Sequence, residues 1–216
     1  MNLLKELLYP PKCLFCQKPL SRGQVDLCPN CREDAPEFTK SKIKHSFIAQ
    51  WTCLWYYKDK ARRSILRYKF YRKRSYALNF SRLLAIKLQK EGFDDVDVLT
   101  WVPVSRLRRF TRGFDQVELL TKAISLDLQI PAVSLLKKIR HTPPQSGIRD
   151  AARRRANVIG AYTVPAPSLV QGKRILLLDD VITSGATASE CAKMLCTAGA
   201  KEVRFAAIAS AEHPMK

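Results

Sequence analysis

The two glycine-rich motifs that most often mark nucleotide sites are missing from this sequence. It contains neither G-x-x-x-x-G-K-[ST] nor G-x-G-x-x-G. Walker-type nucleotide hydrolysis and Rossmann-type dinucleotide binding therefore lose their usual sequence support.

A long apolar run is also missing. The only apolar stretch near the N-terminus, residues 1–8, is interrupted by Lys5 and Glu6. It matches neither the apolar core of a signal peptide nor a membrane-spanning segment. We therefore expect a cytoplasmic protein without a transmembrane segment.

Acidic residues are scarce relative to basic ones. The 216 residues include 38 Lys and Arg but 19 Asp and Glu, which gives a formal net charge of +19. A small anionic ligand requires only a few cations, whereas a polyanion rewards a broad basic surface through counterion release. The charge therefore favours nucleic acid as a partner.

Four of the seven cysteines form two C-x-x-C pairs near the N-terminus, separated by eleven residues. Two such knuckles make one tetrahedral thiolate site, and four thiolates leave no open position for catalysis. We predict a structural zinc, because so short a segment cannot build its own core. A rubredoxin-like iron site and two disulfides are the alternatives, and a reducing compartment disfavours disulfides. The predicted ligands are Cys13, Cys16, Cys28 and Cys31.

The chain length suits one substantial core with a small accessory module. We place the zinc-binding module and its connector at residues 1–46 and the main domain at 47–216. Apolar patterns predict strands over residues 47–57, 96–102, 133–139, 161–164, 175–178 and 202–210, and helices near 65–68 and over 75–90, 115–126 and 188–195. This alternation predicts an α/β fold, a mostly parallel sheet flanked by helices, with ligands beyond the carboxyl ends of the strands.

The segment Arg174–Thr187 is the most informative part of the chain. Its apolar run Ile175–Leu178 reads as a buried central strand that ends at Asp179 and Asp180. A loop rich in hydroxyl groups and a predicted helix start follow, and a helix start binds phosphate dianions. The alternative is that the two acids merely cap a turn. The loop residues expected at the phosphate are Thr183, Ser184, Gly185, Ala186 and Thr187.

This segment resembles the phosphoribosyl-pyrophosphate (PRPP) site of type I phosphoribosyltransferases. The resemblance implies that the acid pair grips the ribose, that the loop holds the 5′-phosphate, and that Mg²⁺ accompanies the ligand. In salvage enzymes for 6-oxopurines the position of Thr183 usually carries a third carboxylate, so threonine makes that substrate class less favoured. The implied PRPP-binding positions in this stretch are Asp179, Asp180, Val181 and Thr183 to Thr187.

A second anion site is predicted in Val102–Gln116, where a basic loop follows a predicted strand. In phosphoribosyl transfer, cations and Mg²⁺ lower the barrier by stabilising charge on the departing pyrophosphate. We expect Arg106 and Arg108 to bind PRPP, and Arg108 and Arg112 to act in catalysis with Asp179 and Asp180. The alternative is an ordinary solvated basic loop.

Together with the cysteine pairs, these segments resemble the ComF family of phosphoribosyltransferase-like competence proteins over nearly the whole chain. The shared features are V-P-V at residues 102–104, an arginine-rich stretch, and R-G-F-D-Q at 112–116, where Asp115 replaces the usual Asn. The family's Lys-Phe pair and its T-x-x-Q, Arg and Asn-Val pattern are matched by Lys69-Phe70, Thr142, Gln145, Arg154 and Asn157-Val158. By analogy, residues 142–157 would form a flap over PRPP.

The resemblance implies a role in natural transformation, with single-stranded DNA and the competence machinery as partners. Basic residues beside Tyr57, Tyr68, Phe70 and Tyr71 could form a stacking groove, although these aromatics could equally belong to the core. The alternatives are an active phosphoribosyltransferase with an unidentified nitrogenous acceptor and a PRPP-sensing regulator. The nucleic-acid candidates are Arg67, Lys69, Arg72, Lys73, Arg74 and Arg154.

Overall fold

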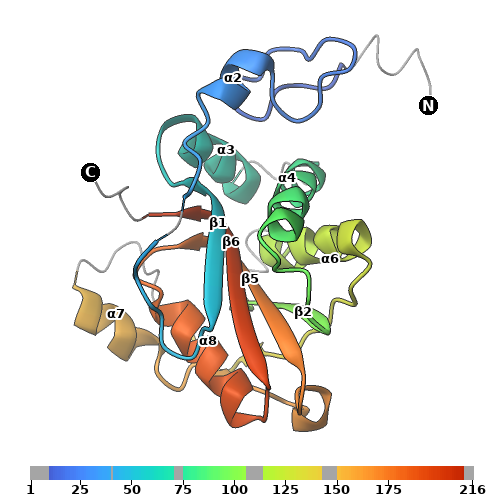
Figure 1. Ribbon diagram of the computed structural model, residues 1–216. Coiled ribbons are helices and arrows are strands. Elements are labelled where there is room, and N and C mark those ends of the chain that lie inside the picture. The colour runs from blue at the N-terminus through green and yellow to red at the C-terminus, as the bar shows by residue number, and fades with distance from the viewer. Residues whose placement is uncertain (1–9, 40, 71–74, 106–113, 143–149, 212–216) are drawn as a thin grey trace.

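The computed structural model describes residues 10–39, 41–70, 75–105, 114–142 and 150–211, and its main sheet is entirely parallel (Figure 1). Its strands lie in the order β1-β6-β5-β2. They comprise β1 (Gln50–Tyr56), β2 (Val98–Trp101), β5 (Arg174–Ile182) and β6 (Glu202–Ser210). The strand with the acid pair is therefore central, as its apolar run predicts.

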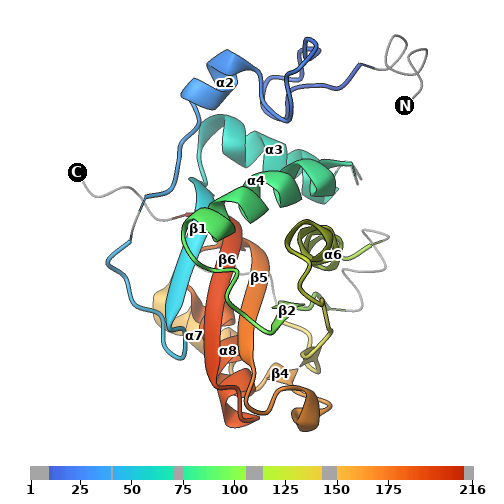
Figure 2. The same ribbon diagram turned by 45° about the vertical axis from the view of Figure 1, so that its right-hand side comes forward.

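Helices cover both faces of this sheet (Figure 2). One face carries α4 (Tyr76–Lys90) and α6 (Gln116–Leu128), and the other carries α8 (Ala186–Thr197) with α7 (Ala151–Val158) against it. Strand β5 serves both cores, because Leu176 and Leu178 pack on the first face while Ile175 and Leu177 pack on the second. All four are fully buried, which explains a continuous apolar run in place of alternation.

Most predicted elements are confirmed, with three corrections. The predicted strand 133–139 is wrong for the most part: only β3 (Lys137–Lys138) forms there, paired antiparallel with β4 (Tyr162–Thr163). The chain before it runs beside β2, where the Val133 N–H donates to the Leu99 carbonyl. Helix α7 was not predicted, and α3 (Asp59–Phe70) is longer than the short helix expected near residue 65.

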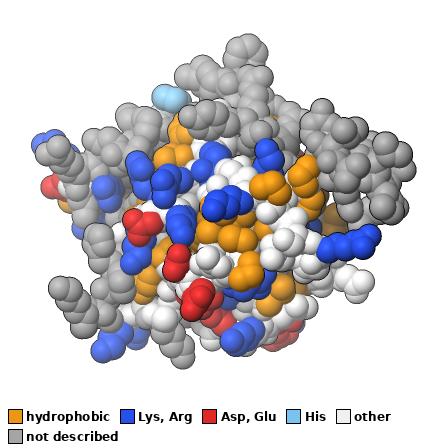
Figure 3. Space-filling model, turned by 90° about the horizontal axis from the view of Figure 1, so that it is seen from above, with side chains coloured by type: hydrophobic (Ala, Val, Ile, Leu, Met, Phe, Trp, Pro, Cys, Tyr) orange, Lys and Arg blue, Asp and Glu red, His pale blue; other side chains and the backbone are white. Residues whose placement is uncertain are grey.

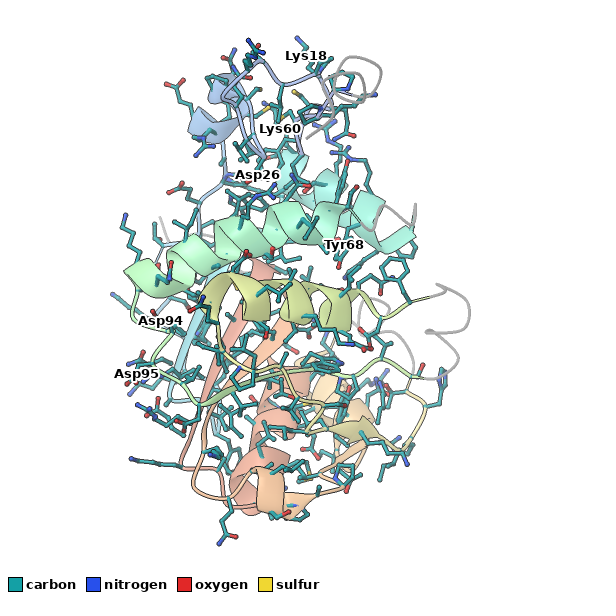
Figure 4. The ribbon with its side chains drawn as sticks, turned by 90° about the vertical axis from the view of Figure 1, so that its right-hand side faces the viewer. Lys18, Asp26, Lys60, Tyr68, Asp94 and Asp95 are labelled. Carbon is teal, nitrogen blue, oxygen red and sulfur yellow. The ribbon has the colours of Figure 1, made fainter. Side chains whose placement is uncertain are left out.

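The N-terminal module, which contains the short helix α2 (Pro29–Glu33), lies against α3 and α4 (Figure 1). Leu14 and Phe15 join the apolar core beneath these helices, and the Phe15 ring lies 4.7 Å from that of Trp55. Asp26 accepts hydrogen bonds from Asn79 and Arg82 on α4 (Figure 4). The module therefore shares a core with the main domain.

No helix within the described ranges combines the length and the apolar character needed to cross a membrane.

Candidate functional site

A cavity of about 610 Å³ opens at the carboxyl end of β5. The acid pair Asp179-Asp180 lies within β5, which continues to Ile182. The acid pair and every residue from Val181 to Thr187 line the cavity. Because α8 begins at Ala186, the loop runs from the end of a central strand into a helix N-terminus. The structure thus brings together the sequence-predicted ribose and phosphate residues of this segment.

Charge within the acid pair is compensated by a lysine. Asp180 Oδ1 lies 2.9 Å from Lys69 Nζ, and the Asp180 N–H donates to Asp179 Oδ1 at 2.7 Å. Desolvation and the neighbouring Asp180 charge raise the pKa of Asp179 well above its ordinary value. Two crowded carboxylates gain from cations or from hydroxyl groups that donate hydrogen bonds, and a ribose diol supplies two such donors.

The conformation of the predicted phosphate loop, residues 183–187, depends on Gly185. This residue is the N-cap of α8 and has φ of 70°, a left-handed conformation that glycine adopts without strain. The His45 imidazole lies where any other residue at position 185 would place its Cβ. A Cβ there would overlap the imidazole. His45 comes from the connector after the N-terminal module and packs on Trp51, with ring centroids 4.9 Å apart. The loop is therefore supported from behind by the connector.

Replacing Gly185 by Ala should cost more stability than replacing Gly172 by Ala. Both glycines have φ near 70°, so both substitutions incur a left-handed strain of about 1–2 kcal/mol. Only Gly185→Ala also collides with His45, because nothing lies within 4 Å of a Cβ at Gly172. We expect thermal melting to show a larger loss of stability for Gly185→Ala than for Gly172→Ala. Adding His45→Ala to Gly185→Ala should recover part of this extra loss. Equal losses for the two single variants would show that His45 does not support the loop.

The cavity has two further walls, and of the predicted flap Thr142 lines one of them while residues 143–149, with Gln145, lie outside the described residues. Helix α3 contributes one wall, and the β3–β4 pair with the end of α7 contributes another. Lys138 Nζ donates to the Thr142 hydroxyl at 2.8 Å and lies 5.2 Å from the centre of the Tyr162 ring. No pattern in the sequence distinguished Lys138 from a surface lysine. Lining residues of these walls include Tyr57, Arg62, Leu66, Lys69, Phe70, Lys138, Thr142, Val158 and Tyr162.

The predicted pyrophosphate loop begins at this cavity. Val102, Pro103 and Val104 line it directly after β2. Asp115, at the far end of the segment, caps α6 by accepting from Val117 N and Glu118 N, and it also accepts from Val104 N. Asp replaces Asn there without loss of the cap, although burial raises the pKa of Asp115. The predicted residues Arg106, Arg108 and Arg112 lie outside the described residues.

The nucleic-acid candidates lie in different environments. Arg67 donates to the carbonyls of Leu14 and Phe15 at 2.8 Å each, so its guanidinium holds the N-terminal module. Lys69 is directed at Asp180 inside the cavity, and Arg154 is half-buried on α7. Arg72, Lys73 and Arg74 lie outside the described residues.

Basic side chains are nevertheless widespread on the surface. Figure 3 shows Lys and Arg interleaved with apolar side chains over the face seen from above. Arg62 and Arg63 on α3 and Arg153 and Arg155 on α7 are exposed. Of these four arginines, Arg62 also lines the cavity.

The four predicted metal ligands converge. The sulfur atoms of Cys13, Cys16, Cys28 and Cys31 all lie within 4.8 Å of one another. Cys16 Sγ and Cys28 Sγ are 3.8 Å apart, and a tetrahedral site with Zn–S bonds of about 2.3 Å has sulfurs about 3.8 Å apart. Although desolvation opposes it, backbone N–H groups lower the pKa of Cys13 to about 7. The distances between the four sulfur atoms therefore fit a structural zinc.

Comparison with known proteins agrees with both parts of the molecule. Residues 119–216 match the family profile described as "Phosphoribosyl transferase domain", and residues 4–43 match "Double zinc ribbon domain". Competence protein F of Haemophilus influenzae is 27% identical over 96% of this chain and 88% of its own. DNA utilization protein YhgH of Escherichia coli K12 is 28% identical over 92% of this chain and 96% of its own.

Among solved structures, the glutamine PRPP amidotransferase of B. subtilis aligns with a TM-score of 0.44 and 24% identity. The alignment covers 65% of this chain and 30% of that one, so this chain spans less than a third of that protein's length.

The parallel sheet, the acid pair with its phosphate loop and the four-cysteine module define a phosphoribosyltransferase-like protein with an N-terminal zinc ribbon. Competence protein ComFC of Streptococcus pneumoniae is a further relative, 27% identical over 89% of this chain and 84% of its own. Over most of its length the chain is thus similar to competence proteins F and ComFC and to DNA utilization protein YhgH, and its two parts match a phosphoribosyl transferase domain and a double zinc ribbon.

Proposed function

We propose that this protein binds PRPP at the carboxyl end of β5 and handles single-stranded DNA in the cytoplasm during DNA uptake. The observation that carries the first part is the joint placement of Asp179-Asp180 and the loop 183–187 in one cavity. The names of its relatives, which include competence proteins and a DNA utilization protein, support the second part.

The proposed ligand matches the chemistry of the cavity group by group. The acid pair would accept hydrogen bonds from the ribose hydroxyls, and the loop with the first turn of α8 would donate N–H and O–H groups to the 5′-phosphate. Mg²⁺, carried by the pyrophosphate and approached by the acid pair, would supply positive charge to the departing group. Arg106, Arg108 and Arg112 remain our proposed pyrophosphate contacts.

DNA binding is supported by charge. The net charge of +19 exceeds what one small ligand requires, and the exposed Arg62 of α3 lines the cavity. A basic surface beside the cavity would follow a phosphate backbone without reading its sequence. PRPP and DNA would then bind in neighbouring regions of the same face.

A titration of fluorescent single-stranded DNA at several salt concentrations, with and without Mg-PRPP, tests the pairing of these ligands. We expect saturable binding that weakens steeply with salt. A PRPP-sensing regulator would show a DNA affinity that changes with Mg-PRPP, because regulation requires coupling between the two sites. Absence of salt-sensitive DNA binding would exclude the DNA part of the proposal.

An active phosphoribosyltransferase is the second candidate, and one observation favours it. The cavity extends past the acid pair to Tyr57 and Arg62, where the guanidinium lies 5.9 Å from the ring centre. A flat nitrogenous acceptor could stack on such a surface. Incubation with Mg-PRPP and panels of acceptors, followed by phosphorus NMR, should reveal pyrophosphate release with one acceptor class if this candidate is correct.

A further inference from the structure

We propose that Lys69 is a ligand-binding residue of the cavity and donates to the pyrophosphate group of PRPP. The inference rests on the proposed PRPP function and goes beyond it by adding a contact from outside the two phosphate-reading loops. It also replaces the sequence-based interpretation of Lys69 as a DNA-binding residue.

The first support is the position of the ammonium group. The Lys69 side chain is 17% exposed and lines the cavity, and its Nζ lies 2.9 Å from Asp180 Oδ1, whose side chain is 13% exposed. A lysine so enclosed requires a partner, and Asp180 is that partner. An ammonium group has three donors, so this ion pair leaves donors that a bound anion can use.

The second support is where Lys69 lies between the two predicted anion sites. The Gln116 side chain donates to the Lys69 carbonyl at 3.3 Å, and the Tyr68 hydroxyl donates to the Gln116 carbonyl at 2.6 Å. Gln116 is the first residue of α6 and the last residue of the 102–116 segment. At the start of that segment, the Val102 N–H donates to the Leu178 carbonyl of β5. Lys69 is thereby held between Asp180 and the start of α6.

The third support is the rigid placement of the helix that carries Lys69. Residues two apart on a helix point to nearly opposite sides, about 200° around the axis. Arg67 accordingly reaches the zinc ribbon while Lys69 reaches the cavity. The buried Tyr68 between them packs on Phe80 and Phe114, with ring centroids 5.5 and 6.3 Å away (Figure 4). Helix α3 therefore presents Lys69 to the ligand from a fixed position.

The test compares Lys69→Met with Lys60→Met in the full-length, zinc-loaded protein. Lys60 lies on the same helix, pairs with the exposed Asp34, and is absent from the cavity lining (Figure 4). Calorimetry with three ligands separates the groups that Lys69 contacts: Mg-PRPP, ribose 5-phosphate and Mg-pyrophosphate. We expect Lys69→Met to weaken Mg-PRPP and Mg-pyrophosphate by about 10- to 100-fold, the size of one charge-assisted hydrogen bond, and to change ribose 5-phosphate affinity by less than about threefold.

Each other outcome has a distinct meaning. Failure of the wild-type protein to bind either PRPP or ribose 5-phosphate would refute the proposed function itself. Normal wild-type binding with unchanged Mg-PRPP affinity in Lys69→Met would refute only the role of Lys69. An equal loss for all three ligands would also contradict a pyrophosphate contact, because it would place the effect on the acid pair.

A measurement on unmutated protein guards against a folding defect in the variant. Lysine acetylation followed by mass spectrometry should show that Mg-pyrophosphate slows modification of Lys69 but not of Lys60. Single-stranded DNA affinity of Lys69→Met should match that of Lys60→Met. A larger loss of DNA affinity with no protection of Lys69 would restore the DNA-binding interpretation and overturn this one.

Discussion

Replacement of both Asp179 and Asp180 by Asn is expected to abolish PRPP binding while leaving the fold intact. Two carboxylates that accept hydrogen bonds from ribose hydroxyls contribute about 1.5–3 kcal/mol for each charge-assisted bond, so their joint loss should weaken affinity by about 100- to 10,000-fold. The fold should persist because Asn keeps the size of each side chain and because burial and the neighbouring Asp180 charge, which raise the pKa of Asp179, no longer oppose a charged group there. Calorimetry with Mg-PRPP measures the first effect and thermal melting measures the second.

The matched control is Asp95→Asn. Asp95 also pairs with a cation, Arg174, but it is 67% exposed and lies at the amino end of β5 (Figure 4). Asp95→Asn removes one negative charge beside the opposite end of β5, so PRPP affinity should remain within about twofold, as for an exposed ion pair. Normal PRPP binding by the Asp179/Asp180 double variant would show that the motif is not the ribose site.

Replacement of Cys13 or Cys28 by Ser is expected to release the metal and to lower the melting temperature by about 10 °C or more. Three thiolates do not complete a structural tetrahedral site, and the ribbon depends on the metal for its own order. Leu14 and Phe15 lie in the core shared with α3 and α4, so a loosened ribbon also exposes the main domain. In a chain of this length, each kcal/mol lost shifts the melting temperature by about 2–4 °C.

The control here is Cys196→Ser, a half-buried cysteine outside the cluster. It should keep one zinc per chain and a melting temperature within a few degrees of the unsubstituted protein. Metal analysis of freshly purified, reduced protein provides the direct readout. Stoichiometric iron, or no metal at all, would contradict the zinc assignment.

Local signals in the sequence sufficed wherever one short segment contains both the structural element and its chemistry. Strand β5, its acid pair and the start of α8 are contiguous, so the apolar run and the loop composition together predicted their arrangement. The same holds for the metal cluster, because the two C-x-x-C pairs bring their sulfurs together through local turns. The beginning of α6 was predicted from the Gly113 break in the sequence, and the structure shows that the Asp115 side chain caps the helix there.

Residues whose role depends on distant partners could not be assigned in this way. Lys69 belongs to a run of basic residues, and only the packing of α3 against α6 directs it to Asp180, more than a hundred positions away. Arg67 in the same run serves the zinc ribbon instead. The composition of the run does not distinguish Arg67 from Lys69, but on α3 the two side chains point to opposite sides.

The sequence by itself predicted the class of protein, the central strand, the segment that lines the cavity and the convergence of the four cysteines. Only the tertiary structure decided which cations enter the cavity, how His45 supports Gly185, and that the ribbon shares a core with α3 and α4. The physical reason is the range of the interactions. Strand burial, helix caps and closely spaced thiolates act over a few residues, but ion pairs and core contacts between separate elements exist only after the chain has packed.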